Sequence, residues 1–587
     1  MLTNSYNKCL EECLNDKYQN IAINSDSHTI IKAGPGTGKT RILTIKAAKL
    51  LLENVEYPRG IACITYTVKA AQELKYRLNL YGISNRKNIY AETIHKFCLN
   101  NIIYPFSNIF SNFSIENYKI IIDPKNEMSE IQKHFNIDKN TKTDFLKLFK
   151  EYKYCKYEQG QEVADKYYTY YKQYFYSRNL LNFDLIMDIA NDLIQNDYIC
   201  KCIEAKYPYI LIDEYQDSSI GMHVLFNTLR EKTNIIFFIV GDPQQSIYGY
   251  SAASSEYFEE LYDSDIFNKI ELKNNYRTQN GIIYTANSFL INNNKNIQIH
   301  DCNCYAKKCN SLEEQIEYII ENILPKLKSK NILPKDICLM YRDKNSEKTI
   351  KQHLVDKNVK FVNNNKVYVN KEYKDSDIII FLEDLIFWLL KENKTDKNIN
   401  FKNLFYDYIK IFYNKKILSK DLKNLLKVNL YKTLHEYTFN KQTLLKDFLK
   451  NLNIFNLIKT SSNENIVAFD SFISLTNDFT IYNFYDFIES KDAIRITTVH
   501  SAKGLEFRAV IIPDLEDGRY PSWGSKTEDE LNEERRLLFV ALSRAKEYLF
   551  VLYSGYYIDI YNRVHKDGVS RFYVENQQLF DDCDDFI

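Results

Sequence analysis

The stretch TIIKAGPGTGKTRILTIKAAKLL, residues 29–51, joins a short apolar run to a glycine-rich loop and then to a helical pattern. Three glycines fall within residues 34–38, where bare backbone N–H groups can close around phosphate oxygens at the start of the next helix. Lys39 is placed to reach the terminal phosphates of a nucleotide, and Thr40 to bind Mg²⁺. The stretch therefore predicts a P-loop, although Ala33 stands where the strict motif has glycine. The residues expected around the phosphates are Gly34, Pro35, Gly36, Thr37, Gly38, Lys39 and Thr40.

A magnesium site of this kind also needs a carboxylate at the end of a neighbouring strand. The run YILIDEYQD, which starts at residue 209, supplies Asp213 and Glu214 directly after an apolar segment. Asp213 is placed to hold Mg²⁺, and Glu214 to polarise an attacking water as a general base. In a chain without a P-loop, two acids at the end of a strand would be an ordinary solvated feature. Together with a P-loop, Asp213 and Glu214 indicate ATP hydrolysis.

The composition is that of a folded protein, with 587 residues of which 45% are hydrophobic and 26% charged. This length allows for roughly four domains, and the low content of glycine and proline (15 and 10) favours long helices. The formal net charge is zero, so a nucleic-acid contact needs a local basic groove. Twelve scattered cysteines and only short apolar runs predict a cytoplasmic protein in a reducing compartment, with no membrane partner.

Buried-strand patterns alternate with helical patterns in two separate parts of the chain, which predicts an α/β fold with two parallel-sheet domains. Two stretches lack the strand pattern and are expected to be mainly helical insertions, one in each domain. The expected boundaries are 1–98 and 182–268 for the first domain, 99–181 for its insertion, 269–390 and 492–587 for the second domain, and 391–491 for a shortened second insertion.

Beyond the P-loop, the chain carries an ordered series of motifs: LNDKYQNIAI, ITYTVKAAQEL, ETIHKFC, ILIDEYQDSS, IVGDPQQSIYGY, LKNNYRT, TTVHSAKGLEF, EERRLLFVALSRAKEYLFV and VSRFYVE. In this order they resemble the motifs of the UvrD/Rep/PcrA group of superfamily 1 DNA helicases. The resemblance spans most of the chain and leaves out only the two insertions. It implies two RecA-like P-loop domains, ATP and Mg²⁺ as cofactors, and single-stranded and tailed duplex DNA as partners.

The resemblance assigns roles around the base and ribose of ATP. Gln19 is expected to hydrogen-bond the adenine edge, and Glu506 to contact the ribose. Arg41 and Tyr276 are expected to enclose the base, a role that suits a planar cation and an aromatic ring. Each of these side chains taken alone would more often be an ordinary surface or packing residue, so the assignment depends on the motif set.

On the phosphate side, the resemblance implies that Gln245 senses the γ-phosphate. It also implies that Arg277 and Arg544 reach the site from the second domain as arginine fingers, which add positive charge where the transition state gathers negative charge. The alternative for either arginine is that it is an ordinary solvated side chain on the surface.

Six residues occupy positions that the family uses for DNA. Aromatic stacking tolerates any base, and phosphate contacts need polar or cationic groups. Tyrosine makes up 47 of the 587 residues, so a packing role for each tyrosine stays open. The residues are Tyr66, Tyr248 and Tyr250 for stacking, and Lys69, His95 and His500 for the DNA backbone.

Three features weaken the match or leave it open. Tyr250 stands where many relatives have tryptophan, and Ser251 where they often have arginine. The second insertion looks short, which makes strand separation less secure than translocation. Lysine and tyrosine interleave in residues 151–179, which fits either a basic, duplex-contacting face or a solvated helix, and we favour the solvated helix.

Taken together, the sequence predicts an ATP-dependent translocase on single-stranded DNA and a DNA helicase, with 3′-to-5′ polarity implied by the resemblance. Its setting is expected to be DNA repair, replication or phage defence. The alternative is an ATP-gated DNA-binding subunit that regulates a partner nuclease or repair protein and unwinds little alone. Only the acidic segment DDCDDFI closes the chain, so no nuclease domain is expected.

Overall fold

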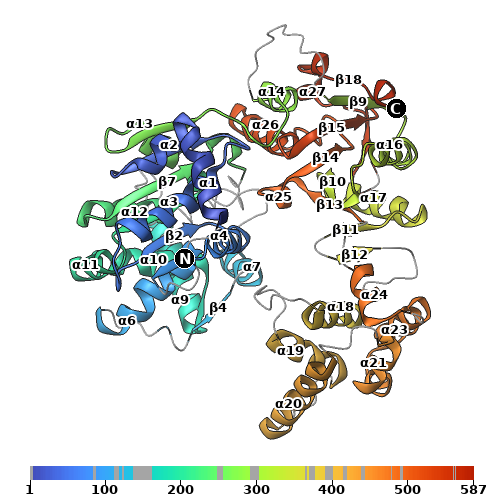
Figure 1. Cartoon of the computed structure of the whole chain (residues 1–587), viewed down its shortest axis with the longest axis horizontal. Helices are drawn as coiled ribbons and strands as arrows, with labels where there is room; N and C mark the ends of the chain where they lie inside the picture. The colour runs from blue at the N-terminus through green and yellow to red at the C-terminus, as the bar shows by residue number, and fades with distance from the viewer. Residues whose placement is uncertain are drawn as a thin grey trace. The chain divides into compact units, whose positions relative to one another are not determined.

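A computed structural model shows the fold of the chain (Figure 1). The chain forms two compact units. The first comprises Met1–Asn280 and Thr527–Ser543, and the second Gly281–Lys526 and Arg544–Ile587. The structure describes residues 4–83, 88–110, 115, 118–121, 125–135, 161–247, 255–290, 303–363, 366–368, 377–390, 401–413, 419–437, 443–476, 479–488, 493–559, 561 and 563–587.

The first unit is built on a six-stranded sheet with the strand order β3-β2-β6-β7-β1-β8. Every neighbouring pair is parallel, so successive strands are joined by helical crossovers. The α/β fold predicted from the sequence is thereby confirmed for this unit. Its strands are β1 (Thr29–Ala33), β2 (Ile61–Thr65), β3 (Ile89–Thr93), β6 (Tyr209–Ile212), β7 (Ile236–Gly241) and β8 (Asn268–Leu272).

Both faces of the central strands β1, β2, β6 and β7 are covered, which is why these strands are largely apolar. Successive side chains of a strand point to opposite faces. Ile30 accordingly packs into one core with Ile64 and Ile210, whereas Ile31 packs into another with Cys63 and Leu211. Helices that cover the sheet are α1 (Asn4–Asn15), α2 (Lys17–Asn24), α3 (Lys39–Glu53), α4 (Val68–Leu80), α10 (Phe183–Leu193), α11 (Asp197–Lys206), α12 (Ile220–Lys232) and α13 (Glu256–Asp263).

The insertion of the first unit shares one continuous core with the sheet. On α9, Tyr168, Tyr171 and Tyr174 are 8%, 1% and 7% exposed, and they belong to the same cluster as Ile30. These three tyrosines are therefore core residues, which neither alternative drawn from the lysine and tyrosine pattern foresaw. The elements here are α5 (Ile94–Cys98), α6 (Tyr104–Phe110), β4 (Lys119–Ile120), α7 (Lys125–His134), α9 (Gln161–Ser177) and β5 (Leu180–Leu181).

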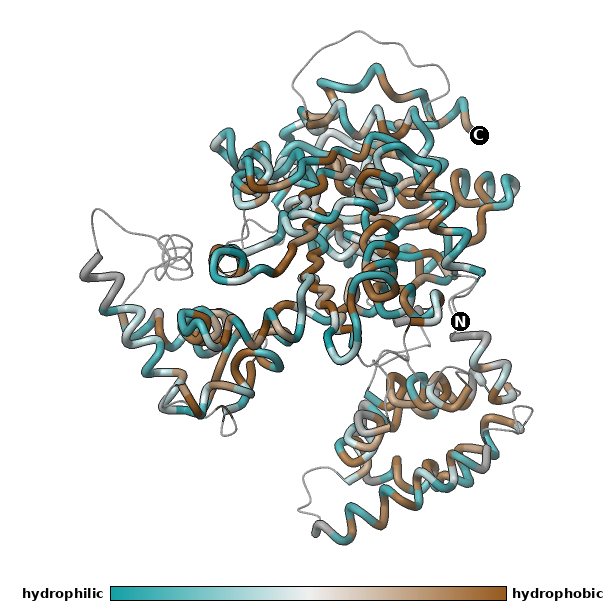
Figure 2. The backbone as a smooth tube through the Cα atoms, turned by 60° about the vertical axis from the view of Figure 1, so that its left-hand side comes forward, coloured by the Kyte–Doolittle hydropathy of each residue, from teal (hydrophilic) through white to brown (hydrophobic). Residues whose placement is uncertain are grey.

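The second unit contains an eight-stranded sheet with the order β12-β11-β13-β10-β14-β15-β9-β18. All its neighbouring pairs are parallel except β11 with β12. Figure 2 shows hydrophobic and hydrophilic residues alternating along the helices of the chain. The strands are β9 (Cys304–Lys308), β10 (Ile337–Tyr341), β11 (Phe361–Asn363), β12 (Lys366–Tyr368), β13 (Ile494–Thr498), β14 (Phe507–Ile512), β15 (Ala545–Tyr553) and β18 (Asp581–Asp582).

The acidic segment at residues 581–587 is part of this fold rather than a tail. Its first two residues form β18 beside β9, and the helix α28 (Cys583–Phe586) follows. Cys583 is 0% exposed and Phe586 6% exposed, because both side chains belong to the core of the second sheet. The other helices around this sheet are α14 (Asn280–Ser288), α15 (Leu312–Tyr318), α16 (Leu324–Ser329), α17 (Lys344–Asp356), α25 (Val499–Ala502) and α27 (Arg571–Val574).

The second insertion has a core of its own, separate from that of the sheet. This core begins with α18, so the helical region starts before the expected boundary at residue 391. Figure 1 shows its helices gathered into one group. They are α18 (Asp377–Leu390), α19 (Phe401–Phe412), α20 (Lys420–Tyr437), α21 (Leu445–Asn451), α22 (Ile454–Leu457), α23 (Asn463–Leu475) and α24 (Ile481–Ile488).

Two further boundaries differ from those expected. Strand β8 pairs with β1, so the first unit continues past residue 268 to Asn280. The helix α26 (Glu528–Leu542) falls with the first unit, although the sequence placed it in the second domain. Across the described ranges, no helix combines the length and apolar character needed to cross a bilayer.

The buried tyrosines of α9 lead to a stability prediction. The Asn182 side-chain amide donates a hydrogen bond of 2.6 Å to the Tyr171 hydroxyl, and both residues are buried. Tyr171→Phe should lower the free energy of unfolding by about 1–2 kcal/mol, because it leaves the Asn182 donor without its partner. Urea denaturation measures this change. Tyr170→Phe, at a partly buried neighbour, should cost less than about 0.5 kcal/mol; equal losses in the two variants would contradict the assignment.

Candidate nucleotide site

The glycine loop, residues 34–38, connects the end of β1 to the first residue of α3. Gly36 has φ of 74° and Gly38 has φ of 91°, a left-handed region that glycine enters without strain. The Thr37 hydroxyl donates a hydrogen bond of 2.9 Å to the Gly34 carbonyl inside the loop. Helix α3 has 15 residues, and the N–H groups of its first turn favour an anion. The loop and helix together form a place for phosphate groups.

Lys39 lies at the mouth of this loop, with its side chain 12% exposed. Its Nζ donates a hydrogen bond of 3.0 Å to the Ala33 carbonyl and lies 3.6 Å from Asp242 Oδ2. Ala33 is the last residue of β1 and is fully buried, so the departure from glycine at this position lies in the strand, where a methyl group is accommodated.

Asp213 and Glu214 follow β6 and lie beside the glycine loop. The Thr40 hydroxyl donates a hydrogen bond of 3.3 Å to Asp213 Oδ2, so the two expected metal ligands are together. Burial, and then the charge of Glu214, raise the pKa of the Asp213 carboxyl, while Lys39 opposes the rise. Hard oxygen ligands at a buried, electron-rich position are what Mg²⁺ binds in phosphate sites.

Glu214 is in the left-handed region, with φ of 55° and ψ of 42°, which is costly for a residue that has a Cβ. The main-chain amide of Glu214 donates a hydrogen bond of 3.1 Å to Asp213 Oδ1. The side-chain amide of Gln216 donates one of 2.6 Å to Glu214 Oε2. The carboxylate is therefore held away from the direction in which a regular strand would continue.

A third acid, Asp242, joins the site from the end of β7, and the sequence reasoning did not assign it. Asp242 is 2% exposed, and its main-chain amide donates a hydrogen bond of 2.9 Å to Gln216 Oε1. Its side chain accepts a hydrogen bond from the amide of Gln245, which is 3% exposed. The signal was present in the sequence, because Asp242 ends the apolar run IIFFIVGD just as Asp213 ends its own.

Gln19, Arg41 and Tyr276 come together at the other end of the glycine loop. Gln19 is 1% exposed, and its Nε2 donates a hydrogen bond of 3.0 Å to the Thr37 carbonyl. Arg41 Nη2 donates one of 3.2 Å to Gln19 Oε1, and its guanidinium lies 5.2 Å from the centre of the Tyr276 ring. The Tyr276 side chain is 55% exposed, which leaves ring surface open beside the cation.

The segment that follows β8 is laid directly on the glycine loop. The Tyr276 amide donates a hydrogen bond of 2.9 Å to the Gly36 carbonyl, and the Asn275 side chain donates one of 2.9 Å to the Pro35 carbonyl. Asn275 Oδ1 in turn accepts from the Arg277 amide at 2.8 Å. Arg277 therefore belongs to the first unit, although the sequence placed it in the second domain.

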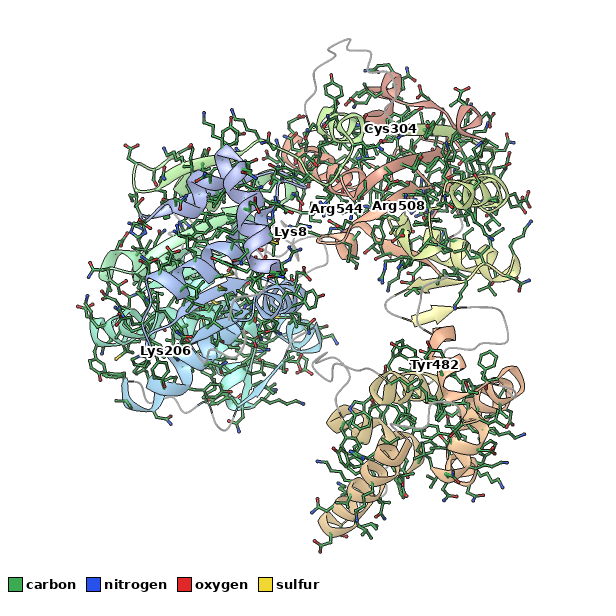
Figure 3. The ribbon with its side chains drawn as sticks, viewed as in Figure 1. Lys8, Lys206, Cys304, Tyr482, Arg508 and Arg544 are labelled. Carbon is green, nitrogen blue, oxygen red and sulfur yellow. The ribbon has the colours of Figure 1, made fainter. Side chains whose placement is uncertain are left out.

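The remaining two expected ATP ligands lie in the second unit. Arg544 immediately precedes β15 (Figure 3), is 2% exposed, and donates a hydrogen bond of 3.3 Å to the Leu505 carbonyl. Glu506 is exposed and forms an ion pair of 2.5 Å with Lys546. These two residues are neighbours within their own unit.

The expected DNA contacts are only partly described. Tyr66 packs partly buried against the core of the first unit. His95 stacks on Phe183 with ring centres 4.2 Å apart, and burial lowers its pKa to about 4. Burial, and then Arg342 and Lys503, also lower the pKa of His500 to about 4. Both imidazoles are neutral at pH 7. Tyr248, Tyr250 and Ser251 lie outside the described residues, as does the Lys69 side chain.

Within the described ranges, no group of three or more His, Cys, Asp or Glu side chains could hold a metal ion. The pair formed by Thr40 and Asp213 is still sufficient for a metal that binds through phosphate oxygens, because Mg²⁺ commonly takes one or two protein ligands there. Two of the described cysteines, Cys304 and Cys309, are buried.

The comparisons with known families cover nearly the whole chain. Residues 14–265 match the UvrD/REP helicase N-terminal domain, and residues 270–387 and 384–556 match the UvrD-like helicase C-terminal domain. The chain therefore belongs to the UvrD/Rep/PcrA-like helicases of superfamily 1, and is by class a DNA helicase.

Individual relatives agree with this class. A probable DNA helicase II homolog of Mycoplasma capricolum is 28% identical over 93% of this chain and 84% of its own length. The ATP-dependent DNA helicase PcrA of Staphylococcus aureus is 27% identical over the same shares, 93% and 84%. The ATP-dependent DNA helicase Rep of Buchnera aphidicola is 27% identical over 92% of this chain and 94% of its own.

Gly36 provides a test of how the site is assembled. An added Cβ there would lie 2.7 Å from both Arg277 Cβ and Asn275 Oδ1, and φ of 74° would strain any side chain. Gly36→Ala should therefore lower the free energy of unfolding by about 1–3 kcal/mol. Gly34→Ala is the matched control, since its Cβ would only meet Thr37 Cγ2 at 4.0 Å. Thermal or urea unfolding of both variants checks this, and an unchanged Gly36→Ala midpoint would contradict the packing.

His95 provides a pH prediction. Because burial lowers its pKa from 6.5 to about 4, the unfolded chain binds more protons than the folded chain between these values. The stability that depends on a neutral His95 is therefore complete above pH 6.5 and is lost as the pH falls toward 4. His95→Phe keeps an aromatic ring stacked on Phe183. It should reduce the free energy of unfolding that is lost between pH 6.5 and pH 4 by up to about 3 kcal/mol. Urea titrations of the wild type and the variant from pH 8 to 4 measure this difference. Free energies of unfolding that fall equally in the two proteins below pH 6.5 would refute the prediction.

Proposed function

We propose that the chain is an ATP-driven translocase that moves 3′ to 5′ along single-stranded DNA and unwinds duplex DNA ahead of it. The observation that supports this most directly is that the ends of β6, β7 and β8 all lie beside the glycine loop that follows β1. Lys39, the Thr40–Asp213 pair, Glu214 and the segment at Asn275–Arg277 all lie there. The names of the relatives, ATP-dependent DNA helicases, point the same way.

The described residues fit ATP with Mg²⁺. The glycine loop offers main-chain N–H groups and the start of α3 to the phosphates. Arg41 Nε is a buried donor that has no hydrogen-bond partner within the described residues, and it lies next to the open Tyr276 ring. In this proposal Thr40 and Asp213 hold Mg²⁺, which supplies positive charge to the β- and γ-phosphates.

The chemistry then falls to side chains of known position. Lys39 moves its ammonium from the Ala33 carbonyl and Asp242 to the terminal phosphates. Glu214 takes the proton of the attacking water as general base, and the Gln216 side chain, which donates a hydrogen bond to Glu214 Oε2, orients its carboxylate. Gln245 exchanges its bond with Asp242 for the γ-phosphate. Arg277 stabilises the charge that develops in the transition state.

Movement requires the second unit to respond to the γ-phosphate. We infer that Arg544 and Glu506 join the bound nucleotide and that hydrolysis releases them, which gives a two-state hinge. A DNA strand held by both units is then gripped in turn. Tyr66, Lys69, Tyr248 and Tyr250 are the proposed contacts of the first unit. His95 and His500 contribute as neutral donors, because the low pKa of each removes its charge at pH 7.

The proposed setting is the cytoplasm. None of the ten described cysteines forms a disulfide, which suits a reducing compartment. Repair, replication and phage defence all need such a motor. A partner nuclease or repair protein stays the alternative context, in which this chain binds DNA under ATP control and unwinds little by itself.

The proposal predicts ATPase activity that single-stranded DNA stimulates at least tenfold. Lys39→Ala and Glu214→Gln should each reduce turnover about 100-fold or more, because they remove the phosphate cation and the general base. Unwinding should favour duplexes with a 3′ single-stranded tail over those with a 5′ tail. Steady-state hydrolysis and a strand-displacement assay measure both. Hydrolysis that ignores added DNA would refute the motor, while DNA-stimulated hydrolysis without unwinding would favour the partner-dependent alternative.

A further inference from the structure

One carboxylate joins the two sides of the expected base site. Asp16 is the N-cap of α2, and its Oδ1 accepts hydrogen bonds of 2.8 Å from the amides of Tyr18 and Gln19. Its Oδ2 accepts one of 2.7 Å from the Asn274 side chain and another from the Tyr276 hydroxyl. The residue is 6% exposed. Helix α2 and the segment after β8, far apart in the sequence, are thus tied through a single side chain.

The negative charge of Asp16 suits this arrangement. Four donors meet two oxygens, and an ionised carboxylate is the side chain that accepts at both ends without presenting a donor. Burial alone would raise the pKa of Asp16, but the hydrogen bonds from Tyr276, Gln19, Asn274 and Tyr18 lower it overall. The group is therefore ionised at neutral pH, and its bonds are charge-assisted.

The Tyr276 hydroxyl has no evident use in stacking, because a phenylalanine ring would stack on a base equally well. The structure gives the hydroxyl another use. The main chain of Tyr276 is held by the Gly36 carbonyl at 2.9 Å, and the far end of the ring is held by Asp16. With both ends fixed, the half-exposed ring cannot swing away from the Arg41 guanidinium.

We propose that Asp16 is a positioning residue that sets the affinity of the site for the nucleotide base. It fixes the Tyr276 ring opposite Arg41, and through the cap of α2 it also fixes the backbone of Gln19. This inference rests on the proposed ATP site and deepens it. It assigns base affinity, as distinct from phosphate affinity, to a residue that touches neither base nor phosphate.

Tyr276→Phe is the sharpest test, since it keeps the ring and the cap of α2 and removes only the hydroxyl. The dissociation constant for a ribose-labelled fluorescent ADP should rise about five- to tenfold, the effect of losing one charge-assisted hydrogen bond that orders the ring. Inorganic tripolyphosphate has no base, so its competition constant should stay within twofold of wild type. Tyr104→Phe, an exposed tyrosine on α6, is the matched control and should change neither constant.

Asp16→Asn supplies the second arm, because asparagine also caps a helix and should keep the chain folded. It should weaken the binding of ADP at least as much as Tyr276→Phe does, because it disturbs the contacts of Asp16 with both Tyr276 and Asn274. In the double variant the two losses should be clearly less than additive, because both changes act on the contact between Asp16 and Tyr276. The kcat for ATP should stay within twofold while KM rises. Additive losses, or an equal loss of ADP and tripolyphosphate, would overturn the proposal and leave Asp16 as a helix cap alone.

The two proposals fail in distinguishable ways. A wild-type chain that hydrolyses no ATP would refute the proposed motor, yet the binding constants for ADP and tripolyphosphate would still test Asp16. A fully active motor in which Tyr276→Phe binds ADP as tightly as wild type would refute the role of Asp16 and leave the motor intact.

Discussion

The close approach of two backbones at Gly36 is the constraint on which the candidate site depends. The Gly36 carbonyl receives the Tyr276 amide, and the space that a Cβ would fill is occupied by Asn275 and Arg277. Only a glycine permits this approach, because it has no Cβ and it tolerates φ of 74°. The loop expected to hold phosphates and the segment expected to hold the base and an arginine are therefore one rigid piece of the first unit.

The electrostatics of the phosphate side follow from burial. Asp213 and Asp242 are each 2% exposed at neighbouring strand ends, and the Lys39 ammonium lies 3.6 Å from Asp242. Removing carboxylates from water disfavours their charge, which is why the pKa of Asp213 is raised. The nearby Lys39 ammonium opposes this rise in the pKa of Asp213 but does not cancel it. In the proposed ATP site, a metal-bound triphosphate brings a cation to these carboxylates together with anionic groups for Lys39 and α3.

Short sequence patterns predicted the strands and the residues around the glycine loop. Apolar runs of four to six residues that end in glycine or acid correspond to the parallel strands, and the glycine loop, Lys39, Thr40 and Asp213 lie together as their spacing implied. The patterns could not show that Asp16 binds Tyr276, because no local rule links positions on different elements. They also misjudged α9, where burial of Tyr168, Tyr171 and Tyr174 depends on a sheet that periodicity in one segment does not reveal. Pairing of β8 with β1 shifted the expected domain limit for the same reason.

Within the first unit, a chain of contacts leads from the phosphate side toward the expected DNA side. The main-chain amide of Asp242 donates a hydrogen bond to Gln216 Oε1, and Gln216 Nε2 donates one to Glu214 Oε2. The Ser246 hydroxyl donates a third to the main-chain carbonyl of Gln216. Arg536 of α26 then donates a hydrogen bond of 3.1 Å to the Ser246 carbonyl. Ser246 directly precedes the segment that contains Tyr248 and Tyr250. Glu214 and Asp242 are thus joined by hydrogen bonds, through Gln216 and Ser246, to the backbone that leads to the proposed stacking residues. In the proposed motor, these packed and bonded groups carry a shift at the nucleotide to the segment proposed to contact DNA.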